Sequence, residues 1–158
     1  MYKLIIIVYF LFILYFIGCS RSNRKPDFIL EFSIEKTGNI SDYEDLKIYY
    51  LDYNDTCLLP YALIMANKYK YNKAYYDVYW CIYSRNPVSN DTFFSLDGLS
   101  PKDRTEALFY LKKGSDLGCL EAMEVLGKYY IYGKYFDKDT LLGNKKIRRA
   151  LCAVVYLI

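Results

Sequence analysis

Histidine is absent from this chain of 158 residues. Histidine is the commonest general base in enzymes, the middle member of the Ser-His-Asp triad and a frequent zinc ligand. Its absence excludes that triad and leaves any catalytic role to carboxylates, lysine, tyrosine or cysteine. The five cysteines include no Cys-x-x-Cys pair, and zinc sites without histidine or paired cysteines are rare. We therefore expect no metal and no other cofactor.

An excess of charge of either sign is also missing. The chain holds 21 basic and 18 acidic residues, so its net charge is only +3. Nucleic-acid binding requires lysine and arginine gathered on one face, and with this small net charge we expect no nucleic-acid partner. Tyrosine, by contrast, is abundant, with 20 residues. Because tyrosine joins a large apolar ring to one polar tip, it suits half-buried helix faces and surfaces that bind proteins.

One long run without charge occurs at the N-terminus, from Leu4 to Gly18. Its 15 residues would extend about 22 Å as a helix, which is less than the hydrocarbon core of a bilayer, about 30 Å. That length favours a secretory signal over a membrane-spanning helix. The alternative is a signal anchor that is not cleaved.

The end of this run, Phe16-Ile17-Gly18-Cys19, resembles the lipobox of bacterial lipoproteins. The resemblance implies that residues 1–18 are a signal peptide, cut off before Cys19. Cys19 would then carry the diacylglycerol and acyl chains, such as palmitate, that hold the protein at a membrane. Residues 19–27 are polar and basic and predict a flexible tether. We expect a protein of the bacterial cell envelope, anchored by lipid and facing the periplasm.

Residues 28–158 carry the spacing of apolar residues that is typical of helices. Residues 28–34 fit a short helix or an extended lead-in, and residues 85–100 carry the signals of a long loop. Ser41 and Glu44 are typical of a capping box at the start of one helix. Ser100-Pro101 is typical of the start of a later helix. Short connections predict antiparallel neighbours. The expected helices are 41–51, 56–70, 73–84, 101–113, 118–132 and 139–156.

Two of these helices share an order of residues. Residues 62–70 align with residues 122–130, and in both an alanine precedes a tyrosine by seven positions. Such an alanine lets two helix backbones approach closely, and the aromatic ring fills the space one level away. This is how helical hairpins interlock in repeat proteins.

The stretch from Ala107 to Gly133, followed by Asp137-Lys138-Asp139, resembles a Sel-one-like repeat, a relative of the tetratricopeptide repeat. Residues 104–139 match as one full unit, with Gly114 at the turn, and residues 42–84 match more loosely. The resemblance implies an all-α fold of antiparallel helix hairpins, a short α-solenoid over residues 28–158. The residues expected to pack the repeats are Ala62, Ala74, Ala107, Ala122, Leu126, Tyr129, Gly118 and Gly133.

A second aromatic stripe occurs on the helix at 73–84, where Ala74, Val78, Cys81 and Ile82 already form an inner face. Tyr76, Tyr79 and Tyr83 recur at helical spacing with Trp80 beside them. The stripe is either a surface that grips a protein or peptide partner, or it is buried under the loop at 85–100 with Phe93 and Phe94. Four cysteines follow Cys19 and permit three disulfide connectivities; we read Cys81 as a core residue.

These observations favour a protein-interaction or scaffold module without enzymatic activity. Paired acidic residues lie at helix starts and turns, where capping explains them. Two alternatives stay open: an envelope or cell-wall hydrolase, and an immunity-type protein that binds and neutralises a toxin. The apolar C-terminal helix either packs back on the preceding hairpin or docks elsewhere.

Overall fold

The computed structural model describes residues 28–52, 58–86 and 95–155, and every regular element in these ranges is an α-helix. The all-α prediction is therefore confirmed, and residues 28–37 form a helix. The predicted signal peptide, the tether, Cys19, Cys57, Phe93 and Phe94 lie outside the described residues. The helices are α2 (Phe28–Thr37), α3 (Ile40–Asp52), α4 (Leu59–Asn67), α5 (Asn72–Tyr83), α6 (Pro101–Asp116), α7 (Leu120–Tyr132) and α8 (Thr140–Val155).

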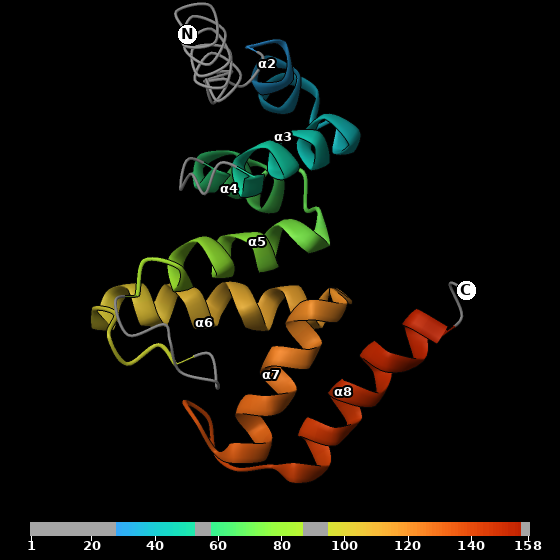
Figure 1. Cartoon of the computed structure of the whole chain (residues 1–158). Coiled ribbons are helices and arrows are strands. Elements are labelled where there is room, and N and C mark those ends of the chain that lie inside the picture. Colours follow the sequence, from blue (N-terminus) through green and yellow to red (C-terminus); the bar gives the residue numbers. More distant parts are fainter. Residues whose placement is uncertain (1–27, 53–57, 87–94, 156–158) are drawn as a thin grey trace, which may run out of the picture.

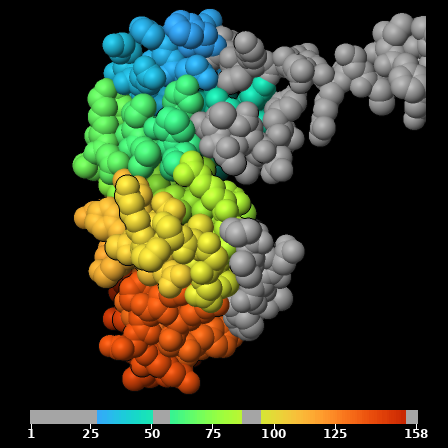
Figure 2. Space-filling model, turned by 90° about the vertical axis from the view of Figure 1, so that its left-hand side faces the viewer, coloured from blue at the N-terminus to red at the C-terminus, as the bar shows by residue number. Residues whose placement is uncertain are grey.

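The helices are stacked in the order of the sequence, from α2 at one end to α7 and α8 at the other (Figure 1). Contacts join α4 to α5, α5 to α6, α6 to α7 and α7 to α8. Figure 2 shows the same order on the surface, where blue, green, yellow and orange-red regions follow one another along the molecule. Each helix thus packs mainly on its neighbours in sequence, as in helical repeat arrays.

Six of the eight predicted packing residues lie in the core, whereas Gly118 is half-buried and Gly133 is exposed. Ala62, Ala74, Ala107, Ala122 and Leu126 are fully buried. Tyr129 is almost fully buried with them. A side-chain carbon added at Gly114 would lie only 3.1 Å from the Cβ of Tyr75 and 3.3 Å from that of Ala122. Small residues therefore let α6 approach both α5 and α7.

The position of Gly114 differs from the prediction. We expected it at a turn, but α6 continues through it to Asp116. The turn is made instead by Gly118, whose φ of +89° lies in the left-handed region that favours glycine. Gly133 ends α7 as predicted: its φ is +67° and its amide donates to the carbonyl of Tyr129.

The helix starts were predicted in part. Ser100 caps α6, and its hydroxyl accepts from the amide of Asp103 at 3.1 Å. The capping box at Ser41 was wrong, because α3 begins one residue earlier and Asn39 is its cap. The side-chain oxygen of Asn39 accepts from the amide of Ser41 at 2.9 Å. Asparagine and serine are about equally good N-caps, so the sequence did not show whether Asn39 or Ser41 caps α3.

Candidate functional site

A pocket of about 250 Å³ opens between α3, α5 and α7. One wall is aromatic, because Tyr76 and Trp80 of α5 stack with ring centroids 6.4 Å apart and planes 29° apart. Trp80 remains 37% exposed. The pocket is lined by Lys47, Leu58, Lys73, Tyr76, Asp77, Trp80 and Glu121.

The structure divides the four residues of the predicted aromatic stripe. Tyr76 and Trp80 line the pocket, whereas Tyr79 and Tyr83 are buried. The hydroxyls of Tyr79 and Tyr129 lie 3.0 Å apart, in hydrogen-bond distance. Burial and this neighbour raise the pKa of Tyr79. Tyr79 and Tyr83 are therefore buried, although the predicted cover by Phe93 and Phe94 lies outside the described residues, and of the four residues a partner could reach only Tyr76 and Trp80.

The floor of the pocket holds Asp77, a carboxylate that is only 5% exposed. One of its oxygens lies 2.9 Å from the ammonium of Lys47, and the other accepts a hydrogen bond from Tyr43 at 2.8 Å. Burial raises the pKa of Asp77, although Lys47 and Tyr43 act to lower it. Burial also acts to lower the pKa of Lys47, but the carboxylates of Asp77, Glu44 and Glu121 together raise it. The buried side chains of Tyr43 and Asp77 and the half-buried one of Lys47 thus form a polar cluster between α3 and α5.

The cluster extends to the rim of the pocket. Glu44 lies 3.8 Å from the ammonium of Lys47 and accepts a hydrogen bond from the hydroxyl of Tyr71 at 2.7 Å. On α7, Glu121 accepts from the thiol of Cys119 at 3.2 Å. Burial acts to raise the pKa of Glu121, but its own backbone amide, Cys119 and the nearby lysines lower it overall.

Two carboxylates of one pocket therefore have pKa values displaced in opposite directions, Asp77 upward and Glu121 downward. Such a divergence is common at functional sites, although structural ion pairs produce it as well. Here both oxygens of Asp77 are already engaged by Lys47 and Tyr43. The cluster is thus well suited to fixing the wall of the pocket.

The sequence carried one signal for Asp77 that was missed. Asp77 falls on the same helix face as Ala74, Val78 and Cys81, so it is a charge inside an apolar stripe. A charge in that position is almost always paired when buried. Its partner Lys47 lies 30 residues earlier, on another helix, and no local pattern connects the two.

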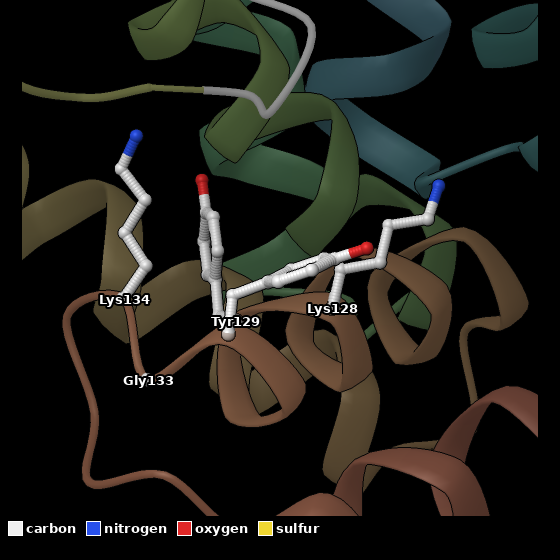
Figure 3. Close-up of a pocket in the computed structure, with 5 residues that line it drawn as sticks. Lys128, Tyr129, Gly133 and Lys134 are labelled. Atoms are coloured by element: carbon white, nitrogen blue, oxygen red, sulfur yellow. The ribbon is translucent and has the colours of Figure 1, made fainter.

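A second cavity, of about 330 Å³, lies at the C-terminal end of α7. Figure 3 shows Lys128 and Lys134 on opposite sides of Tyr129. The ammonium of Lys128 lies 2.7 Å from Glu124, and that of Lys134 lies 3.7 Å from Asp97. Both cations at this cavity therefore already have carboxylate partners.

Other kinds of site are not seen in the part of the chain that the structure describes. No group of acidic or cysteine side chains there could hold a metal ion. Cys81 and Cys119 are buried free thiols, and Cys152 is an exposed one. None of the helices in ranges 28–52, 58–86 and 95–155 has the length and apolar character needed to cross a bilayer. No family model, curated protein or solved structure matches the chain.

Proposed function

We propose that this protein is a lipid-anchored helical-repeat protein of the bacterial cell envelope that binds a protein partner and has no enzymatic activity. The resemblance of Phe16–Cys19 to a lipobox supports the anchor, and the stacked helices support the scaffold role. The partner inserts a side chain into the pocket between α3, α5 and α7.

The observation that carries this proposal is the open aromatic wall made by Tyr76 and Trp80. Tryptophan and tyrosine dominate binding energy at protein interfaces because they bury a large area and lose little conformational freedom. Behind this wall the Asp77–Lys47 ion pair is preformed, so the wall does not have to reorganise on binding. A rigid aromatic surface beside charged groups of both signs suits recognition of a partner's side chain.

The test replaces Trp80 with a photo-crosslinking amino acid in the full chain. We expect a discrete crosslinked partner in the cell envelope, and we expect the additional change Tyr76→Ala to weaken it. Phe109 of α6, also an exposed aromatic residue, provides the matched control position. Equal crosslinking from both positions would contradict the proposal. A toxin as the captured partner would assign the immunity-type role.

The anchor has its own test. We expect the full chain to incorporate radiolabelled fatty acid and Cys19→Ala to lose the label. Cys152→Ala, which removes an exposed thiol elsewhere, is the control and keeps it. Unchanged labelling in Cys19→Ala would remove this cysteine as the acceptor and leave the uncleaved signal anchor.

An envelope hydrolase is the second candidate, favoured by the opposite pKa displacements of Asp77 and Glu121 in one pocket. In that role Asp77 would be the general acid and Glu121 the general base. The assay measures release of soluble fragments from purified cell wall. Release that is lost in both Asp77→Asn and Glu121→Gln would replace the binding proposal, and we expect no release from the unaltered protein.

A further inference from the structure

The last helix, α8, packs on the molecule through one face only. A side-chain carbon added at Gly127 of α7 would lie 2.8 Å from the backbone oxygen of Gly143 and 2.8 Å from the side chain of Ile147. Ala150, two turns beyond Gly143, is buried on the same side. Figure 1 shows α7 lying along α8, with no other labelled helix on its far side.

The opposite face of α8 is basic and exposed. Leu141, Lys145, Arg148, Arg149 and Cys152 recur at intervals that place them within about a third of the helix circumference. All five are exposed, and with Asn144 they line a shallow groove of about 400 Å³. We call this set the outer face of α8.

The positive charge of the outer face is not neutralised locally. Thr140–Val155 contains no acidic residue. The nearest carboxylate that pairs with α8 is Asp116, which lies 3.8 Å from Lys146, on the side toward α6. Among the described residues, none forms an ion pair with Lys145, Arg148 or Arg149. Three long cations therefore point away from the stack without a counter-charge from the described helices.

Exposed leucines accompany these cations. Leu141 is 85% exposed at one end of the helix, and Leu151 is 61% exposed near the other. Lysine and arginine attract the headgroups of anionic lipids, and leucines beside them can enter the boundary between headgroups and acyl chains. A nucleic acid would be matched by the cations but not by the leucines. The combination thus favours a lipid surface as the occupant.

We propose that the outer face of α8 lies on the anionic surface of the membrane to which the chain is attached. This inference takes the membrane attachment from the proposed function, but it does not depend on the pocket at Trp80. Attachment at the N-terminus and a second contact at α8 would together orient the stack relative to the bilayer. Two weak membrane signals in one chain bind far more firmly than one.

Cys152 provides a direct probe, because it belongs to the outer face and is exposed. The other two described thiols are poor competitors for alkylation. Burial raises the pKa of Cys81 to about 11 and that of Cys119 to about 12, and the thiolate is the reactive form. Peptide mass spectrometry of alkylation by N-ethylmaleimide therefore reports the accessibility of Cys152 separately from that of the other cysteines.

The experiment uses the full chain with vesicles of phosphatidylcholine alone and of an equal mixture with phosphatidylglycerol. We expect alkylation of Cys152 to be slowed roughly fivefold or more by the anionic vesicles only. High salt should restore the rate, since it screens the attraction. Equal rates with both kinds of vesicle would overturn the proposal. Protection by dissolved DNA or polyglutamate without vesicles would overturn it too, since it assigns the face to a soluble polyanion.

Matched variants separate charge from folding. Arg148→Gln/Arg149→Gln should abolish the protection of Cys152, because it removes two charges from the outer face. Lys102→Gln/Lys113→Gln removes the same charge from exposed positions of α6 and should leave the protection intact. Retained protection in the first variant would contradict the proposal. Flotation with neutral vesicles reports the N-terminal attachment separately, so failure of the anchor and failure of the α8 contact give different results.

Discussion

Asp77 is the one buried charged residue among those whose side chains the structure describes. Burying a carboxylate is costly, and the Lys47 ammonium and the Tyr43 hydroxyl offset that cost by engaging both of its oxygens. Such a pair adds little net stability compared with apolar residues of the same volume. Its geometry, however, is directional, so it fixes how α3 lies against α5 and holds Trp80 at the edge of the pocket.

Removing one member of this pair should lower the free energy of unfolding far more than removing both. We expect Lys47→Met to lower the free energy of unfolding by about 3–5 kcal/mol, since Asp77 is left as an uncompensated buried charge. Lys47→Met/Asp77→Asn should recover much of the loss. Urea unfolding of the unaltered protein, Lys47→Met and the double variant measures these free energies. Lys112→Met is the control, because its pair with Asp116 is half exposed, and it should cost less than about 1 kcal/mol.

The loss in Lys47→Met should also depend on pH. Burial already raises the pKa of Asp77 in the folded protein, and removing the Lys47 charge raises it further. A carboxyl whose folded pKa lies above its unfolded pKa favours the folded state most at low pH, where it is neutral in both states. The cost of Lys47→Met should therefore be largest at neutral pH and shrink as the pH falls. An equal cost at neutral and mildly acidic pH would show that Asp77 does not carry the effect.

At the scale of the helix, α7 and α8 approach each other closely. Gly127 and Gly143 face each other, and a side-chain carbon at either would come within 2.8 Å of the other's backbone oxygen. Alanine is the better helix former by about 1 kcal/mol, so glycine at both positions reflects packing. The sequence pattern indicated Gly118 and Gly133 at the ends of α7 but not this pair inside the helices.

Substitution at this crossing tests its importance. We expect Gly127→Ala to lower the free energy of unfolding by about 1–3 kcal/mol despite the better helix propensity, because the helices must move apart. Thermal unfolding followed by circular dichroism measures the change. Asn144 follows Gly143 on the exposed side of α8. The control Asn144→Ala should therefore leave the stability unchanged or slightly raised. A stabilised Gly127→Ala would mean that α7 and α8 are not held this closely.

At the scale of the molecule, the stack has no single centre, since each helix packs mainly on its neighbours in sequence. Stability in such arrays is local and decreases toward the ends. We expect backbone amides of α8, which packs on α7, to exchange with deuterium faster than those of α5, which lies between α4 and α6. Gly127→Ala should speed exchange in α8 and leave α4 and α5 unchanged. Hydrogen exchange with mass spectrometry measures both, and uniform acceleration along the chain would indicate one cooperative unit.

The helical fold was predictable because its signals are local. Apolar residues at helical spacing indicated the helices, Ser100 and Gly133 marked two of their ends, and Ala62, Ala107 and Ala122 marked the packed faces, all as observed. Each of these signals depends on residues fewer than a dozen positions apart. Composition alone also removed the histidine-based chemistries.

The pocket could be predicted only in part, because its residues come from three helices that are distant in the chain. The sequence placed Tyr76, Tyr79, Trp80 and Tyr83 on one helix, and the structure left only Tyr76 and Trp80 at the pocket. The structure also pairs Asp77 with Lys47 and brings Glu121 to the same pocket. Periodicity determines which face of a helix is apolar. Which neighbour covers that face, and so which side chains meet, depends on how the helices pack, and this only the tertiary structure decided.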